Sequence, residues 1–255
     1  MKLEEAAAAG AFEPDLSLWD PWRPEQVAAL LEGVEAPWYV AAGWAIDLFL
    51  GEERREHEDL EIAVPRVRFP EIGERLSGFE LFLGEQRREH EDLEIGVPAK
   101  RFGEVVAALD GLEFHTVSPD PAKAPRADGR GCTLATPIGL AGALLESSHQ
   151  TWALDRAAGA WRLDVFREPS DGDVWIYRRD QRIRRPYRDV IERTDGGIPF
   201  ARPELVLLFK AKQVVRPKDE ADFQAVLPRL GSDRRRWLAD ALRLVHPGHP
   251  WLERL

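Results

Sequence analysis

The apolar and polar residues of this chain follow strand and helix patterns in the first two thirds and mainly helical patterns after residue 200. Residues 38–40, WYV, have the composition of a strand. Residues 44–50 carry apolar side chains at helical spacing, and Gly51 stands where a helix commonly ends. Residues 161–166 alternate between apolar and polar side chains, as a strand does. This mixture predicts an α+β fold.

Other segments complete this first part. Pro24 is expected to open a helix with apolar residues at helical spacing, and residues 174–179 are expected to form an antiparallel return strand. Residues 119–131 have the composition of a loop, whereas residues 136–147 fit either a helix or a buried turn. Residues 149–152 are expected to precede a turn.

The remainder of the chain is predicted to be helical. Pro203 opens a helix whose apolar stripe also carries Lys212, whereas Lys210 projects to the side. Pro217 is expected to break this helix, and two more helices are expected over residues 219–227 and 233–245. We therefore expect an α/β domain over residues 1–198, a helical domain over residues 199–255, and an active cleft between them.

Composition and charge narrow the classes of function. A chain of 255 residues with 44% hydrophobic residues can bury a real core. Its net charge of −10 argues against a long nucleic-acid groove and suits a small cationic partner. The single Cys132 cannot form an intramolecular disulfide, and no apolar run approaches the roughly 20 residues that span a bilayer. A cytoplasmic protein without a membrane partner is expected.

The chain contains a tandem duplication. LFLGEERREHEDLEIAVPRVRF, residues 48–69, returns as LFLGEQRREHEDLEIGVPAKRF, residues 81–102, so that Asp59 has its counterpart in Asp92. Two copies are too few for a solenoid, which needs at least three repeats. The pattern indicates a duplicated strand–helix unit inside the α/β domain.

Each copy carries an Asp-x-Glu pair, Asp59 and Glu61 in the first and Asp92 and Glu94 in the second. The alternation of a strand places both carboxylates of a pair on one face, where they repel each other unless a cation lies between them. A hard divalent metal such as Mg²⁺ is the usual cation, because it takes oxygen ligands and binds substrate phosphates. An isolated pair of this kind is more often a solvated face.

The surrounding residues strengthen the functional interpretation. Gly43-Trp44-Ala45 followed by His57-x-Asp59-x-Glu61 resembles the nucleotidyltransferase superfamily, and more closely its aminoglycoside nucleotidyltransferase-like branch. The resemblance continues in residues 161–166 and 203–223. It departs from the family at Ala42, where many members have glycine. It implies a nucleotidyltransferase-type mixed sheet with flanking helices and a C-terminal helical domain.

The resemblance also implies roles for individual residues. Asp59 and Glu61 would bind Mg²⁺, and Asp164 would be the third metal ligand or the base that activates the acceptor hydroxyl. The nucleotide, ATP, would be bound by five residues: Gly43, Trp44, Arg55, Lys210 and Lys212. Arg55 could equally lie in a solvated turn, and Asp219 and Asp222 can be explained as acidic residues that stabilise a helix start.

The implied activity is the Mg²⁺-dependent transfer of a nucleoside monophosphate, AMP from ATP, to a hydroxyl of an aminoglycoside-like acceptor. Asp59 and Glu61 are favoured over Asp92 and Glu94 as the working pair, because Gly43-Trp44 lies at a suitable distance upstream. One rival is a nucleotidyltransferase acting on RNA or protein, for which residues 178–185, RRDQRIRR, would supply a basic strip. Another is a non-catalytic nucleotide-binding protein.

Overall fold

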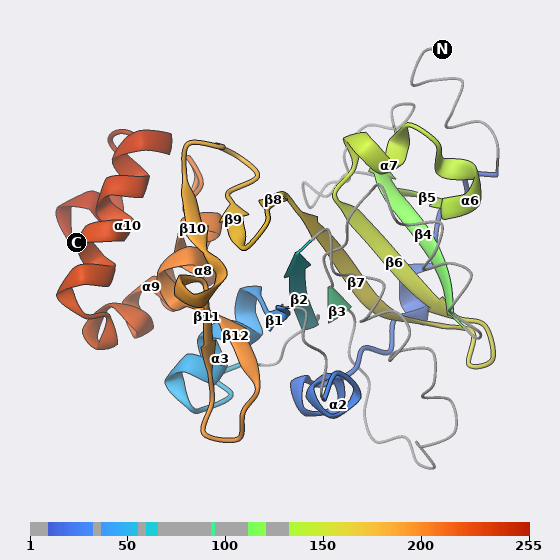
Figure 1. Ribbon diagram of the computed structural model, residues 1–255, viewed down its shortest axis with the longest axis horizontal. Coiled ribbons are helices and arrows are strands. Elements are labelled where there is room, and N and C mark those ends of the chain that lie inside the picture. The colour runs from blue at the N-terminus through green and yellow to red at the C-terminus, as the bar shows by residue number, and fades with distance from the viewer. Residues whose placement is uncertain (1–9, 33–36, 56–59, 66–92, 95–111, 121–132) are drawn as a thin grey trace.

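The computed structural model describes residues 10–32, 37–55, 60–65, 93–94, 112–120 and 133–255. The strands of residues 112–168 lie on one side of the molecule and the C-terminal helices on the other, and the strands of residues 39–40 and 60–65 lie between them (Figure 1). This arrangement confirms the predicted α+β fold with a helical C-terminal part. Among the described residues, none of the helices has the length and apolar character that crossing a bilayer requires. The cytoplasmic location stays a prediction.

The large sheet is mixed, as predicted. Its order is β11-β12-β1-β2-β7-β6-β4-β5, with β3 paired to β2. The pairs β1–β12, β2–β7 and β2–β3 are parallel and the others are antiparallel. The strands are β1 (Tyr39–Val40), β2 (Leu60–Pro65), β3 (Leu93–Glu94), β4 (Leu112–Pro119), β5 (Thr133–Pro137), β6 (Gln150–Asp155), β7 (Ala160–Glu168), β11 (Ile191–Arg193) and β12 (Pro199–Ala201).

A small second sheet follows β7. It consists of β8 (Ser170–Asp171), β9 (Val174–Ile176) and β10 (Arg184–Pro186), all antiparallel. The predicted return strand is therefore shorter than residues 174–179 and pairs with β8 and β10 instead of β7. Both neighbours of β7 in the large sheet, β2 and β6, are already in place, which leaves no edge for a return strand.

The helices begin and end where proline and glycine predict. Proline stands in the first turn of α2, α8 and α9, and Gly51 ends α3 with a left-handed φ of 76°. The helices are α2 (Pro24–Leu30), α3 (Ala42–Leu50), α6 (Ile138–Ala141), α7 (Leu144–Ser147), α8 (Pro203–Lys210), α9 (Pro217–Val226) and α10 (Ser232–Val245). Short 3-10 turns are η1 (Leu16–Leu18), η3 (Tyr187–Asp189), η4 (Leu227–Arg229) and η5 (Pro250–Glu253).

One local prediction, the placement of Lys212 on the helical stripe, is wrong. Helix α8 ends at Lys210, because Ala211 leaves the helical conformation with ψ of 99°, so Lys212 does not lie on the helical stripe. Residues 149–152 precede a turn, as expected, because β6 leads into a turn at residues 156–159 before β7; the strand itself, which pairs with β4 and β7, was not predicted. Its polar residues Gln150 and Thr151 hide the strand pattern, although Thr151 is buried.

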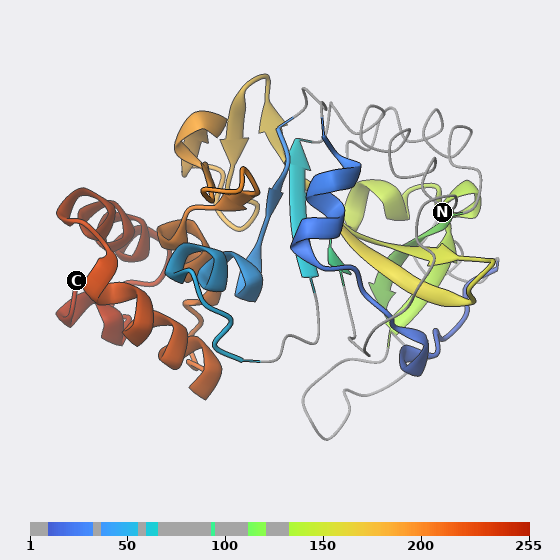
Figure 2. The same cartoon turned by 90° about the horizontal axis from the view of Figure 1, so that it is seen from below.

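One apolar core joins the sheet to the C-terminal helices. Helix α3 contacts α8 and α9 on one side and β2 and β12 on the other, and its place beside the C-terminal helices can be followed in Figure 2. The same buried cluster contains Ile46 of α3, Phe200 of β12, Leu208 of α8 and Trp251 of η5. The predicted boundary at residue 198 precedes β12, so this strand pairs with β1 across it.

Candidate functional site

The sheet brings two of the predicted metal-binding positions together. Strands β2 and β7 run parallel in a register that pairs the Cα atoms of Glu61 and Asp164. Strand β3 of the second copy pairs with β2 at the equivalent position, Glu61 with Glu94. Asp59 and Asp92 lie outside the described residues. The register therefore places Asp164 directly beside the first acidic strand, as the prediction required.

The Asp164 carboxylate is buried and held by the neighbouring strand. Trp152 Nε1 donates a hydrogen bond of 2.7 Å to Asp164 Oδ2, and Gln150 Nε2 donates to the same oxygen. Only 1% of the residue is exposed. Both donors come from β6, whose Trp152 pairs with Asp164 in the sheet. The two neutral N–H groups fix the orientation of a carboxylate that has little freedom of its own.

The turn from β1 into α3 has the geometry that a phosphate-binding turn needs. Ala42 has a φ of 45°, a left-handed conformation that glycine adopts more easily. A glycine at position 42, which the resemblance in sequence led us to expect, would adopt this conformation with less strain. Gly43 and Trp44 form the first turn of α3 and are buried, and no side chain caps the helix start. An uncapped first turn presents backbone N–H groups that suit an anion.

A pocket of about 260 Å³ opens beside this turn. Its walls come from the β1–α3 turn, β2, β7, β9, β12, α8 and the segment that follows α8. Its aromatic lining consists of Tyr39, Phe166, Trp175 and Phe209, and its charged lining of Glu168, Arg178, Arg179, Lys210, Lys212 and Arg216. The lining has five cations and one carboxylate, and three of the cations, Arg178, Lys210 and Arg216, pair with acidic residues in or behind the lining. The remaining excess of positive charge favours an anionic ligand with an apolar or aromatic portion.

The arginines of the pocket are fixed by aromatic and acidic neighbours. The Arg178 guanidinium lies 4.7 Å from the ring centres of both Phe166 and Phe209, and its Nη1 lies 2.7 Å from Glu168 Oε1. Arg179 Nη1 donates a hydrogen bond of 2.8 Å to the Phe209 carbonyl oxygen. Sequence analysis missed both arginines as binding residues and considered them only as part of a surface strip.

Lys212 is the cation whose environment most favours an anion. Partial burial lowers its pKa, and the positive charges of Arg216, Arg179 and Lys210 lower it further against the opposing effect of Asp219. The residue is nevertheless exposed enough to meet a ligand. A bound anion would offset this repulsion, so the site gains more from phosphate than an isolated lysine would.

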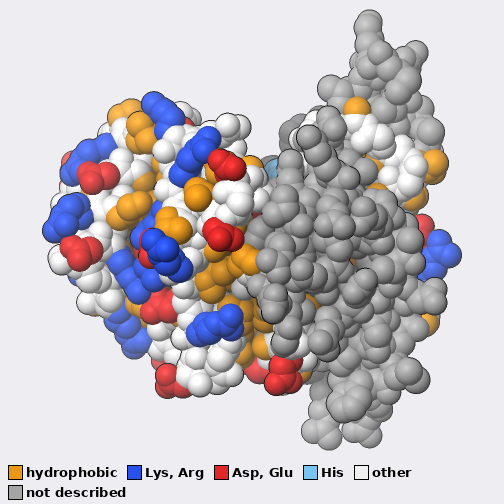
Figure 3. Space-filling view, in the orientation of Figure 1, with side chains coloured by type: hydrophobic (Ala, Val, Ile, Leu, Met, Phe, Trp, Pro, Cys, Tyr) orange, Lys and Arg blue, Asp and Glu red, His pale blue; other side chains and the backbone are white. Residues whose placement is uncertain are grey.

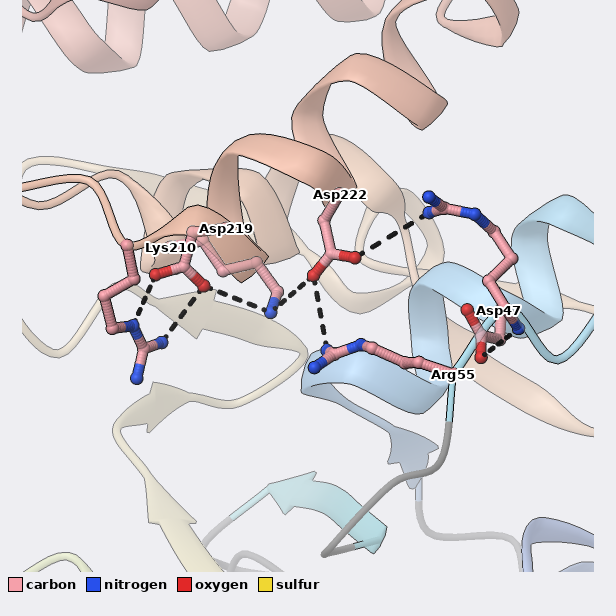
Figure 4. Close-up of polar contacts among 7 residues, drawn as sticks. Asp47, Arg55, Lys210, Asp219 and Asp222 are labelled. Carbon is pink, nitrogen blue, oxygen red and sulfur yellow. Dashed lines mark hydrogen bonds and ion pairs between the residues drawn. The ribbon is translucent and has the colours of Figure 1, made fainter.

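Lys210 and Arg55 are both held by acidic residues of α9 (Figure 4). Lys210 Nζ lies 2.9 Å from Asp222 Oδ2 and 3.5 Å from Asp219 Oδ1. Arg55 Nη2 lies 3.4 Å from Asp222 Oδ2. The predicted phosphate contacts of Lys210 and Arg55 stay predictions, and in this structure their charges meet carboxylates.

The two aspartates are more than helix-start residues. Asp219 is fully buried and Asp222 is 2% exposed. Burial alone would raise the pKa of Asp219, but hydrogen bonds from Arg216 and the charge of Lys210 outweigh it, so the pKa is lowered. A sequence signal existed, because Asp219 and Asp222 share one helical face and their segment follows two lysines.

The predicted magnesium site rests on residues that are only partly described. Within the described segments, His, Cys, Asp and Glu side chains form no group of three that could hold a metal ion. Asp164 fits such a site, because a buried and oriented carboxylate beside Glu61 offers the hard oxygen ligand that Mg²⁺ prefers. The completing ligand, Asp59, remains a prediction.

A comparison with protein families agrees with the resemblance seen in the sequence. Residues 25–81 match a family described as Aminoglycoside-2''-adenylyltransferase. No curated protein sequence matches the chain significantly. The match confirms the predicted resemblance to the aminoglycoside branch of the nucleotidyltransferases and the prediction of an adenylyltransferase-like enzyme.

Two solved structures are similar over most of the chain. The antibiotic-resistance factor ANT(2'')-Ia aligns with 14% identity and a TM-score of 0.40, covering 86% of this chain and 89% of the other. The lincosamide antibiotic adenylyltransferase LnuA, with lincomycin bound, aligns with 13% identity and a TM-score of 0.41, covering 81% and 97%. Both TM-scores lie below 0.5, so neither likeness defines the activity of this chain.

Proposed function

We propose that the protein transfers a nucleoside monophosphate, AMP from Mg²⁺–ATP, to a hydroxyl of a small cationic acceptor of the aminoglycoside kind. The observation that carries this proposal is the position of the cationic pocket. The pocket opens at the start of α3 and is lined by Ala63 of β2 and Phe166 of β7, in the two strands that pair Glu61 with Asp164. A triphosphate there would reach both the basic residues and the acidic strand.

Different groups would bind the two parts of ATP. The first-turn N–H groups of α3, together with Lys212 and Arg216, would hold the phosphates. The aromatic side chains Phe209 and Trp175 would contact the apolar face of the nucleotide. Because Arg178 is fixed by Glu168 and two phenylalanine rings, it would keep its place while the ligand binds.

The acidic residues would serve the reacting groups. Asp59, Glu61 and Asp164 would hold Mg²⁺, whose chemistry is to neutralise phosphate charge and align the nucleotide for in-line attack. Asp164 would act as the third ligand or accept the proton of the acceptor hydroxyl. Trp152 and Gln150 would keep its carboxylate oriented for either role.

The cationic acceptor follows from charge and from the family match. A net charge of −10 attracts cations, and the pocket beside α3 is too basic to bind one, so the acceptor would bind on the other side of the transferred phosphate. The family description names an aminoglycoside as the substrate of its members.

The rival activity on RNA is disfavoured by the arginines of residues 178–185. Arg182 pairs with Asp180 at 2.5 Å, Arg184 lies 3.8 Å from Asp171, and Arg185 pairs with Glu204 at 3.0 Å. Figure 3 shows acidic and basic side chains interspersed over the C-terminal part of the molecule on the face drawn there. Paired and mixed charges do not form the basic face that phosphate backbones require.

A transfer assay tests the proposal. The purified protein would be incubated with Mg²⁺, ATP labelled in its α-phosphate and a panel of aminoglycosides, with a neutral sugar of similar size as the control acceptor. We expect label in the aminoglycoside, none in the sugar, and loss of transfer with EDTA or in Asp164→Asn. Transfer that survives EDTA and Asp164→Asn would contradict the proposed site.

A further inference from the structure

Asp222 is a buried acidic residue of α9 that contacts charged residues of the C-terminal helices and of the segment before β2. Its carboxylate contacts cations from two distant parts of the chain. Lys210 Nζ lies 2.9 Å from Oδ2, Arg55 Nη2 lies 3.4 Å from Oδ2, and Arg54 Nη1 lies 3.8 Å from Oδ1 (Figure 4). The Asp222 side chain is 3% exposed and that of Lys210 is 9% exposed, so the contact between them is shielded from water and salt, whereas Arg54 and Arg55 are 28% and 32% exposed.

Arg54 and Arg55 connect Asp222 to β2, the acidic strand, because they precede this strand in the chain. Arg55 stands only six positions before Glu61 and ends the described segment that follows α3. The same segment is anchored to α3, because the Arg54 backbone N–H donates a hydrogen bond of 3.1 Å to Asp47 Oδ2. Arg55 is the last described residue before β2, and its segment is therefore anchored to both α3 and α9.

Lys210 connects Asp222 to the cationic pocket. Lys210 is the last residue of α8 and lines the pocket. Asp219, one helical turn before Asp222, receives two hydrogen bonds from Arg216, at 2.6 and 3.0 Å, and Arg216 also lines the pocket. The acidic face of α9 thus holds two of the pocket's cations.

We propose that Asp222 is a positioning residue that sets the placement of β2 relative to the cationic pocket by holding Arg55 and Lys210 together. This inference rests on the proposed function, since it concerns the alignment of a nucleotide in that pocket with the acidic strand. Asp222 itself touches no reacting atom. Asp222 affects the rate of transfer in the bound complex, kcat, more than it affects the affinity for the nucleotide.

The inference predicts a particular division of kinetic effects. A misplacement of about 1 Å costs on the order of 100-fold in rate, because reacting groups must be aligned before transfer. We expect Arg55→Gln to lower kcat about 10- to 100-fold and to change the Kd of Mg²⁺–ATP less than about threefold. Arg55→Lys, which keeps the charge, should recover part of the rate.

A double-mutant cycle distinguishes positioning by Asp222 from a direct contact of Arg55 with phosphate. Asp222→Asn, Arg55→Gln and the double variant would be compared for kcat and for Mg²⁺–ATP affinity. If the pair acts as a unit, the double variant is no slower than the slower single variant. Additive losses, or a large loss of ATP affinity in Arg55→Gln alone, would overturn the inference. Asp240→Asn, which removes the exposed pair with Arg243 at 2.7 Å, is the matched control.

Hydrogen exchange gives a readout that does not depend on activity. We expect faster amide exchange in Leu60–Pro65 of β2 in both Arg55→Gln and Asp222→Asn, with rates in Asp240→Asn equal to the wild type. Unchanged β2 exchange in Arg55→Gln would overturn the inference even if Asp222→Asn fails to fold. A wild-type protein without transferase activity would refute the proposed function, and β2 exchange would then still decide the structural coupling. An active wild type with unaffected variants would refute the positioning role alone.

Discussion

Two buried aspartates, Asp164 and Asp222, are held in different ways. Asp164 on β7 accepts hydrogen bonds from the neutral groups of Trp152 and Gln150 and is placed by the backbone register of the sheet. Asp222 on α9 is placed by ion pairs with Lys210 and two arginines. The first arrangement keeps a carboxylate oriented, and the second uses a carboxylate to hold other groups.

This difference separates the expected effects of substitution. An asparagine at position 164 still accepts hydrogen bonds from both donors, so the change should mainly affect chemistry. An asparagine at position 222 removes the nearer counter-charge of the buried Lys210 amine, so the change should mainly affect stability and alignment.

The largest effect is expected at the acidic strand of the first copy. Asp59→Asn with Glu61→Gln should lower transfer at least about 1,000-fold, because both metal-binding carboxylates are lost while the strand remains. Asp92→Asn with Glu94→Gln in the second copy is the matched control and should leave activity near the parent level. Transfer rates with labelled ATP would measure both. The opposite result would make the second copy the working one, and equal partial losses would indicate exchange between the copies.

Substitution of Asp222 should destabilise the protein more than substitution of Asp164. We expect Asp222→Asn to lower the free energy of unfolding by about 3 kcal/mol, since breaking a buried ion pair leaves charges uncompensated. Asp164→Asn should cost about 1 kcal/mol, the scale of one altered hydrogen bond. Urea unfolding followed by tryptophan fluorescence would give both values. Equal losses of unfolding free energy in the two variants would contradict the view that Asp164 is oriented by neutral hydrogen bonds whereas Asp222 holds cations by ion pairs.

Nucleotide affinity should depend on Lys212. We expect Lys212→Gln to weaken Mg²⁺–ATP binding about 10-fold, because one charge-assisted phosphate contact is lost. Lys218→Gln is the matched control, since Lys218 is exposed on α9 and does not line the pocket. Calorimetric titration at two salt concentrations would measure the difference. If both variants bind ATP equally well, the phosphates do not occupy this pocket.

The smallest effect is expected at the β1–α3 turn. Ala42 adopts a φ of 45°, so Ala42→Gly should relieve strain of about 1 kcal/mol, partly offset by the greater freedom of glycine in the unfolded chain. We expect a net gain of less than about 1 kcal/mol in the free energy of unfolding. Gly51→Ala, at a φ of 76°, should show a loss instead. A destabilised Ala42→Gly variant would mean that the turn carries no strain.

The elements set by local pattern were predictable from the sequence. The apolar spacing before Gly51 predicted α3, the alternation of residues 161–166 predicted β7, and Pro203 predicted the start of α8. The expected neighbourhood of Asp164 and the first acidic strand also agrees with the register of β2 and β7.

The elements set by distant contacts were not predictable. Lys210 falls at the side of a predicted helical stripe, yet it is buried because Asp219 and Asp222 bind its amine after the chain turns. Arg178 looks like part of a charged strip, and only the fold brings it between Phe166 and Phe209. Local periodicity contains no information about such partners, which come from segments far apart in the sequence.

A crystal structure with Mn²⁺ and a non-hydrolysable ATP analogue would test the central claim most directly. We predict a metal ion bound by Asp164 and the first acidic pair, Asp59 and Glu61, with the triphosphate at the first turn of α3 and beside Lys212. A triphosphate bound outside this pocket, or a metal ion coordinated without Asp164, would contradict it.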